Sequence, residues 1–256
     1  MILLVDAGNT RIKWMTLNAD GMAPGGACPT TEAAGLRRDW GAVAATRAVV
    51  ACVAGESTRA DLAGLLADMG VEAHWVRAAP NAHGLVNPYR PPEALGADRY
   101  AAMVGAFRRF GRDCVVVGVG TAMTADMLSA GGEFLGGCIV PGPDLMRESL
   151  SRGTARVGRM AGAFQFLPRD TGGAVATGIA LALLGVVRGM VERLEVERLE
   201  VERPGLAREG NASPAVVLTG GARACLAPLL EGAVFEVDDL VLEGLAWIAR
   251  DLGFAA

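Results

Sequence analysis

The sequence is poor in several residue types that common catalytic and binding sites require. Its 256 residues contain 24 basic side chains, of which Lys13 is the only lysine, and two histidines, His74 and His83. Two isolated histidines give little material for a Ser–His–Asp or Cys–His arrangement, and neither has the spacing of a zinc ligand. No GxxxxGK[ST] segment occurs, which excludes a Walker-type phosphate loop. Carboxylates, glycine-rich turns and one ammonium group remain as candidates for chemistry.

Other absences narrow the class of protein. The net charge is −4 and no run of basic residues occurs, which argues against a nucleic-acid-binding surface. The five cysteines lie far apart without a CxxC pair, as expected for reduced thiols in a cytoplasmic protein. The longest uncharged stretch, 171–187, is short for a membrane span and predicts a buried helix. No basic segment precedes the first apolar run, so we expect a strand there rather than a signal peptide.

The first thirteen residues form the most informative stretch. Ile2 to Val5 is a short apolar run typical of a strand that is buried on both faces, and Arg11 to Leu17 resumes a strand-like pattern. Asp6-Ala7-Gly8-Asn9-Thr10 between them predicts a tight turn. Its N–H groups can form an anion-binding concavity, and Asp6 can hold Mg²⁺. An ordinary hairpin turn is the alternative interpretation.

Lys13 strengthens the functional interpretation of this turn. A chain that otherwise uses only arginine places its one ammonium seven residues after Asp6. An ammonium is a compact point charge that suits a phosphate oxygen, whereas a guanidinium is a planar fork. The segment therefore suits a polyphosphate–metal complex.

The rest of the chain predicts an α/β fold with two related halves. Strands are expected at 48–53 and 71–76 with a helix at 57–69 between them, while 20–47 shows only weak periodicity. At Cys114 a second buried strand leads into another Gly/Thr turn, Gly118 to Thr121, and then a resumed strand containing Asp126. The repeated hairpin predicts two halves, 1–112 and 113–256, that face each other across a cleft. Gly118-x-Gly120 lacks the third glycine of a dinucleotide fingerprint, and a strand follows it.

The later segments are less specific. We expect a long apolar helix from Thr171 to about Arg193. The sequence Leu-Glu-Val-Glu-Arg occurs twice in succession, at 194–198 and 199–203, and is called the doublet below. Its Glu/Arg pairs favour a solvated helical extension, although its alternation of apolar and charged residues also fits a strand. Pro204 to Pro214 predicts a loop, Gly220 to Ala222 would let the backbone approach a flat ligand, and 240–252 is an amphipathic helix.

Residues 80–100 contain four prolines and two glycines and interrupt the alternation of strands and helices. A long ordered loop of this kind often carries function. It ends at Gly96-Ala97-Asp98-Arg99, directly before a helix expected at Tyr100 to Phe110. Asp98 is either the N-cap of this helix or, with Arg99 and Tyr89, part of a site offering a base, a cation and a phenol to a small polar substrate.

Five segments, taken together, resemble the ordered motif set of the type III pantothenate kinases. They span most of the chain in the expected order and comprise 6–13, 92–99, 120–126, 136–142 and 170–178. The resemblance implies an actin-like (ASKHA) fold of two ribonuclease-H-like halves with an interdomain cleft, and a cytoplasmic homodimer. The implied reaction is the ATP-dependent phosphorylation of pantothenate to 4'-phosphopantothenate, the first step of coenzyme A biosynthesis.

The resemblance also assigns roles to residues. ATP binding with Mg²⁺ falls to the turn and the residues beside it, namely Asp6, Ala7, Gly8, Asn9, Thr10, Arg11, Ile12, Lys13 and Thr121. Pantothenate binding falls to Tyr89, Gly96, Ala97, Asp98, Arg99 and Thr171, with Thr171 supplied by the partner subunit. Asp98 is the implied general base, which agrees with the need of phosphoryl transfer for an oriented hydroxyl and a proton acceptor.

One position departs from the pattern. The family commonly has an aspartate at the start of the second turn that helps bind an activating K⁺ or NH₄⁺ ion, and this chain has Gly118 there. We therefore expect weak or absent potassium activation. Two alternatives to a pantothenate kinase remain: a non-catalytic, kinase-like regulatory accessory protein, or another actin-like small-molecule kinase.

Overall fold

The computed structural model describes residues 1–154, 157, 160–201 and 213–254, in two compact units. The first unit comprises Met1–Gly111, Gly131–Glu133 and Asp239–Ala256, and the second comprises Arg112–Ala130 and Phe134–Asp238. The first boundary lies within one residue of the predicted division. The two other segments of the first unit differ from that division, which placed them in the second half.

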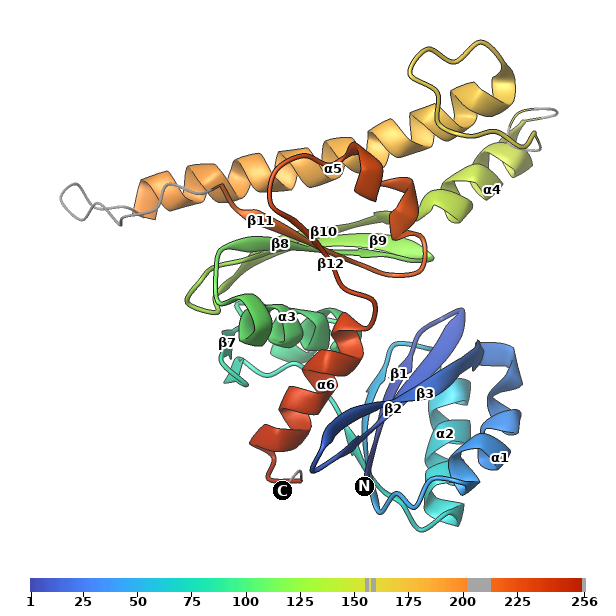
Figure 1. Cartoon of the computed structure of the whole chain (residues 1–256), viewed down its shortest axis with the longest axis vertical. Coiled ribbons are helices and arrows are strands. Elements are labelled where there is room, and N and C mark those ends of the chain that lie inside the picture. The colour runs from blue at the N-terminus through green and yellow to red at the C-terminus, as the bar shows by residue number, and fades with distance from the viewer. Residues whose placement is uncertain (155–156, 158–159, 202–212, 255–256) are drawn as a thin grey trace. The chain divides into compact units, whose positions relative to one another are not determined.

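The first unit is built on a five-stranded sheet in the order β3-β2-β1-β4-β5. Its first three strands form an antiparallel meander, and β4 and β5 are parallel to β1 and to each other (Figure 1). The bounds are β1 Ile2–Ala7, β2 Arg11–Asn18, β3 Gly21–Pro29, β4 Arg47–Cys52 and β5 Glu72–Trp75. The predicted strands are confirmed, except that β3 was not foreseen.

Helices cover both faces of this sheet. A 3₁₀ helix at Thr30–Gly35, α1 (Leu36–Gly41) and α2 (Glu56–Asp68) cover one face, where Leu62 and Leu66 of α2 pack among apolar side chains of β1 and β4. On the other face lie α3 (Ala97–Phe110) and α6 (Leu240–Asp251) (Figure 1). A Cβ added at Gly244 would lie 1.8 Å from the Ala101 carbonyl oxygen, so glycine permits this close helix crossing. The crossing explains why the last helix belongs to the first unit.

The expected loop between β5 and α3 is largely confirmed and contains small elements. These are β6 (Asn81–Ala82), β7 (Leu85–Val86) and a 3₁₀ turn at Pro92–Ala94. The Val86 N–H donates to the Gly132 carbonyl at 2.9 Å, and a Cβ on Gly132 would lie 2.0 Å from the Gly84 carbonyl oxygen. These contacts join 131–133 to the first unit.

The second unit repeats the topology of the first. Its sheet has the order β10-β9-β8-β11-β12, with two antiparallel pairings followed by two parallel ones. The bounds are β8 Cys114–Val119, β9 Ala122–Leu128, β10 Phe134–Pro141, β11 Ala215–Thr219 and β12 Val234–Glu236, with helices α4 (Pro143–Gly153) and α5 (Thr171–Val201). Short 3₁₀ turns lie at Arg223–Cys225 and Ala227–Leu229. The repeated hairpin predicted from the sequence is therefore a repeat of the whole sheet.

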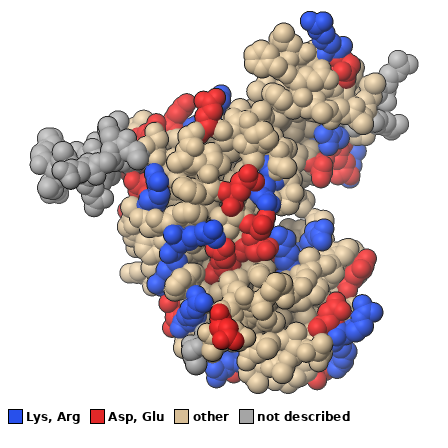
Figure 2. All heavy atoms as spheres, in the orientation of Figure 1, with Lys and Arg blue, Asp and Glu red and all other residues tan. Residues whose placement is uncertain are grey.

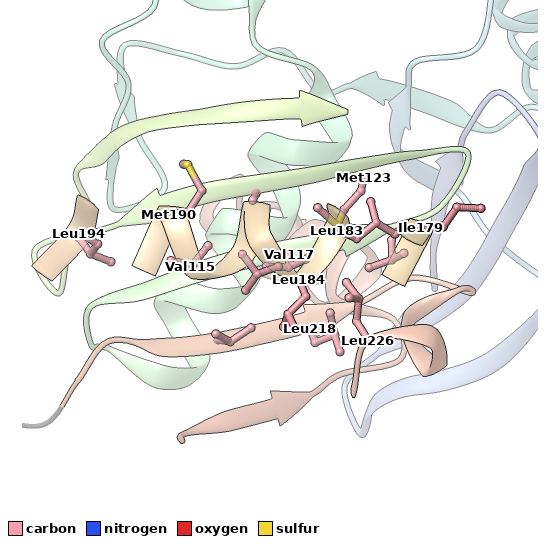
Figure 3. Close-up of a cluster of buried hydrophobic side chains, with 14 of the residues drawn as sticks. Val115, Val117, Met123, Ile179, Leu183, Leu184, Met190, Leu194, Leu218 and Leu226 are labelled. Atoms are coloured by element: carbon pink, nitrogen blue, oxygen red, sulfur yellow. The ribbon is translucent and has the colours of Figure 1, made fainter. Parts of the chain in front are cut away.

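Helix α5 supplies the main core of the second unit. Its inner face, including Ile179, Leu183, Met190 and Leu194, packs on side chains from β8, β9 and β11 (Figure 3). The helix continues through the doublet to Val201, which confirms the helical extension that far; 202–203 and 204–212 lie outside the described residues. Among the described residues, Thr171–Glu197 is the one helix long and apolar enough to cross a membrane, and 44% of its most apolar window is buried.

Charged residues of both signs are spread over the visible face of the molecule (Figure 2).

The described cysteines are all free thiols. Burial raises the pKa of the Cys114 thiol to about 12, which agrees with a structural rather than a reactive role.

Candidate active site

The first Gly/Thr turn is shorter than predicted. Asp6 and Ala7 complete β1, so the turn consists of Gly8, Asn9 and Thr10. The Gly8 N–H donates to the Arg11 carbonyl at 3.0 Å, which closes the hairpin. Thr30 fixes the turn from outside, since its hydroxyl donates to the Gly8 carbonyl at 2.8 Å and its N–H to the Thr10 carbonyl at 3.0 Å.

Two residues of the predicted ATP segment face the protein core. Ala7 and Ile12 are fully buried, whereas Asn9, Thr10 and Arg11 are exposed. Ala7 and Ile12 can therefore offer a ligand only their backbone groups. The exposed side chains of Asn9, Thr10 and Arg11 form the surface open to an anion.

Asp6 and Lys13 lie opposite each other in the β1–β2 register. The Lys13 ammonium forms an ion pair with Asp239, its Nζ lying 3.2 Å from Oδ1. Burial raises the pKa of Asp6 to about 7, and the Asp98 carboxylate and then Asp239 add to the rise, while Lys13 lowers it. Two neighbouring carboxylates therefore disfavour the charged form of Asp6, beside the only ammonium side chain in the chain.

Asp98 lies in the first turn of α3 but does not cap it. The helix begins at Ala97, three residues earlier than predicted, and Gly96 is the N-cap. The N-cap interpretation of Asp98 is therefore wrong. Its Oδ1 accepts the Arg99 N–H at 2.8 Å, and a Cβ on Gly96 would lie 2.7 Å from the same oxygen. Glycine at 96 thus leaves room for this carboxylate.

Tyr89 and Arg99 are brought together by the loop. Arg99 is buried, and its Nη1 donates to the Tyr89 hydroxyl at 3.5 Å. The loop is shaped by Asn87, which is only 5% exposed. The Tyr89 N–H donates to Asn87 Oδ1 at 3.1 Å, and Asn87 Nδ2 donates to the Pro92 carbonyl at 3.0 Å. Asn87 therefore braces the segment that carries Tyr89.

The second turn, in the second unit, is likewise shorter than predicted. Gly118 completes β8 with Val119, and Gly120 and Thr121 make the turn. The backbone of Gly142 packs closely against this turn: a Cβ added at Gly142 would lie 2.0 Å from the Gly120 carbonyl oxygen. At Gly220 an added Cβ would lie 2.3 Å from the Val119 carbonyl oxygen. The close approach at Gly220 is therefore to the chain's own backbone, while the approach of a flat ligand to Gly220–Ala222 stays a prediction.

Thr171 is the first residue of α5 and is exposed. The preceding Asp170 caps this helix, since its Oδ1 accepts the Gly173 N–H at 2.8 Å. This hydrogen bond, with a second from Gln165, holds the pKa of Asp170 below its usual value. The position of Thr171 is thus set by a well-capped helix N-terminus.

The structure brings together Asp6, Lys13 and Asp98 in the first unit, and joins Tyr89 to Arg99; Thr121 and Thr171 belong to the second unit. Sequence reasoning missed Asp239, Asn87 and Thr30. Asp239 lies 226 residues from Lys13 along the chain, so no local pattern marks it. At Asn87 there was a local signal, because an asparagine in a proline-rich loop often forms an Asx turn with the residue two positions later.

A divalent cation fits the chemistry of these residues when a nucleotide is present. No group of three His, Cys, Asp or Glu side chains in the described part of the chain could hold a metal ion unaided. Mg²⁺ in kinases is usually held by one or two carboxylates together with the substrate phosphates. Burial, and then the Asp98 and Asp239 carboxylates, raise the pKa of Asp6, and a bound cation would offset this cost of ionisation, so Asp6 suits that role.

Comparison with known proteins decides the family. The family model of the type III pantothenate kinases matches residues 2–193. A type III pantothenate kinase of Azoarcus sp. is 42% identical over 253 residues, covering 97% of this chain and 90% of its own length. The chain belongs to the type III pantothenate kinase family. A second member, from Nitrosomonas eutropha, is 38% identical and is covered to 96% of its length.

Solved structures support the same fold at lower identity. A Campylobacter jejuni protein described as a Baf family transcriptional activator superposes with a TM-score of 0.62 at 19% identity, with 98% of each chain covered. A 2-dehydro-3-deoxygalactonokinase-like protein from Sinorhizobium meliloti gives 0.55 at 16% identity, over 98% of this chain and 99% of its own. With its two sheets of equivalent strand order, the chain has the actin-like (ASKHA) fold predicted from the sequence.

Proposed function

We propose that the protein transfers the γ-phosphoryl group of ATP to the primary hydroxyl of pantothenate, giving 4'-phosphopantothenate in the first step of coenzyme A biosynthesis. The observation that carries this proposal is the position of Asp98 in a chain of this family. Its carboxylate lies close enough to Asp6, at the end of β1, to raise the pKa of that residue. A proton acceptor and a phosphate-binding turn thus lie near each other.

ATP is bound in this proposal by residues 6–13 and by Thr121. The turn N–H groups and the Lys13 ammonium neutralise the phosphate oxygens, while Ala7 and Ile12 contribute backbone groups only. Mg²⁺, held by Asp6 together with the nucleotide, would supply further neutralisation of the developing charge.

Pantothenate is bound by Tyr89, the segment Gly96–Arg99 and Thr171. Asp98 accepts a hydrogen bond from the substrate hydroxyl, which orients the oxygen for in-line attack on the γ-phosphorus. As the new P–O bond forms and the bond to the ADP oxygen breaks, the hydroxyl proton passes to Asp98. The buried Arg99, which contacts the Tyr89 hydroxyl, supplies a positive charge for the substrate carboxylate.

Activation by K⁺ or NH₄⁺ is weak in this proposal because Gly118 offers no carboxylate. Backbone carbonyls and water remain as ligands, and without a negative charge they hold a monovalent cation less tightly. Asp126 is an alternative source of charge, since it is a buried carboxylate on β9, the strand paired with the one that carries Gly118.

The working form is a cytoplasmic homodimer in which Thr171 serves the partner's substrate site. Support comes from apolar side chains left exposed around the N-terminal half of α5. Phe166 is 89% exposed, Leu167 68% and Leu181 53%. Exposed apolar groups gathered in one region mark an interaction surface more often than a free one.

Consumption of ATP in a coupled assay, with and without pantothenate, tests the proposed function. We expect ADP formation that requires pantothenate and Mg²⁺ and is not supported by sugars or sugar acids. Turnover with a sugar acid alone would favour another actin-like kinase. Absence of turnover with every acceptor, in a protein that binds ATP, would favour a non-catalytic accessory role.

A further inference from the structure

Asp239 is the partner of the Lys13 ammonium within the described part of the chain. Its Oδ1 lies 3.2 Å from Lys13 Nζ, and the two side chains are 37% and 34% exposed. Asp239 belongs to the first unit with Lys13, at the start of the segment that ends the chain. The contact therefore joins the strand that follows the phosphate-binding turn to the beginning of α6.

The conformation of Asp239 gives a second, independent observation. It occupies the N-cap position of α6, where an aspartate usually accepts a hydrogen bond from an N–H of the first helical turn. No such bond is made; φ is −125° and ψ is 45°. The carboxylate does not cap the helix; it accepts a hydrogen bond from the Lys13 ammonium instead.

The pair matters because Lys13 is the only ammonium side chain of this protein. In the proposed function, Lys13 binds a nucleotide phosphate. A carboxylate bonded to Lys13 occupies one of the three N–H donors of the ammonium and compensates part of the positive charge that attracts a phosphate oxygen. Asp239 and the nucleotide phosphate therefore compete for the same charge.

We propose that Asp239 is a positioning residue that holds the Lys13 ammonium beside the phosphate-binding turn and competes with the nucleotide phosphate for it. This inference rests on the proposed function only through the phosphate-binding role of Lys13. Asp239 keeps the side chain of Lys13 from ranging freely in solvent, and it lowers the affinity for nucleotide. The same competition speeds the release of ADP after transfer.

A double-mutant cycle on ADP binding tests the competition, measured by calorimetry at fixed Mg²⁺ and ionic strength without pantothenate. Asp239→Asn should bind ADP about 2- to 5-fold more tightly, the range expected for a partly exposed ion pair. Lys13→Ala should bind more weakly, and in that background Asp239→Asn should have little effect. Asp61→Asn on α2, an exposed position with the same change of charge, is the matched control and should leave affinity unchanged.

Asp239→Ser guards against a folding artefact, because serine caps helices well and also lacks the charge. It should reproduce the tighter binding of Asp239→Asn. Weaker ADP binding by both variants would overturn the proposal, as would equal tightening in the Lys13→Ala background. The binding experiment contains no pantothenate, so its result does not depend on whether pantothenate is the acceptor. Failure of this proposal and failure of the proposed function can therefore be told apart.

Discussion

The ionisation of Asp6 makes the free protein less stable as pH rises. The fold raises the pKa of this carboxyl from its ordinary value of 3.8 to about 7, because burial and the Asp98 and Asp239 carboxylates disfavour the charged form. Between these values the native state keeps a proton that the unfolded chain has released. The contribution of Asp6 to the free energy of unfolding therefore falls as pH rises from about 4 to about 7, and levels off above that.

The magnitude follows from the shift. About three pKa units, at about 1.4 kcal/mol each, set an upper value of about 4 kcal/mol for the stability lost across this range. Asp6→Asn replaces the carboxyl by a neutral group of the same shape. The variant should therefore approach the wild-type stability near pH 4.5 and exceed it by up to about 4 kcal/mol at pH 8, while losing activity.

Urea unfolding from pH 4.5 to 8.5, without nucleotide or metal, measures the effect, with Asp61→Asn as a control of equal charge change. The difference between Asp6→Asn and wild type should grow with pH, and that between Asp61→Asn and wild type should not. Parallel pH curves for Asp6→Asn and wild type, or a variant that is less stable at pH 8, would show that the native state does not hold a proton on Asp6 over this range.

Three further predictions concern turnover. Asp98→Asn should keep the fold, because its amide oxygen can still accept the Arg99 N–H, and should lose about 10²–10⁴ in kcat; a rate near wild type would show that Asp98 is not the base. Potassium should activate weakly or not at all over a sodium- or Tris-only buffer, and Gly118→Asp should create activation. The new Cβ would lie 3.2 Å from Thr124 Oγ1, so the Thr124 side chain must shift slightly; strong saturable activation of the wild type would contradict this prediction. Asn87→Ala should raise the KM for pantothenate about tenfold and leave the KM for ATP unchanged. The substitution removes the hydrogen bonds that hold the Tyr89 segment, at a cost of about 1–3 kcal/mol in the free energy of the ordered loop. Equal changes in both KM values would indicate general damage to the fold.

Short-range pattern was enough to predict much of this fold. The apolar runs at Ile2 and Cys114, each ending in a Gly/Thr turn, identified two hairpins, and the structure extends them to two sheets of equivalent order. Strand β3 was not predicted, because its Gly/Ala/Pro composition is not typical of a strand. Its glycines are explained by packing: a Cβ on Gly25 or Gly26 would lie within 2.7 Å of atoms of Trp14.

Long-range placement could not be predicted from the sequence. The amphipathic pattern of the last helix indicates that it is packed, but not that glycines at 105 and 244 let it cross α3 in the first unit. The contact of Asp239 with Lys13 depends on that placement and was missed with it. Likewise, Gly96 and Asp98 were singled out from their motif, but the start of α3 at Ala97 required the structure.

Identification of the product is the decisive test of phosphoryl transfer to pantothenate. The purified protein would be incubated with Mg²⁺, ATP and pantothenate, and the mixture analysed by ³¹P NMR and mass spectrometry. We predict one new phosphomonoester on the primary hydroxyl of pantothenate, formed in equal amount to ADP and nearly absent with Asp98→Asn. ADP released without a phosphorylated pantothenate, or equal product from the Asp98→Asn variant, would contradict the account.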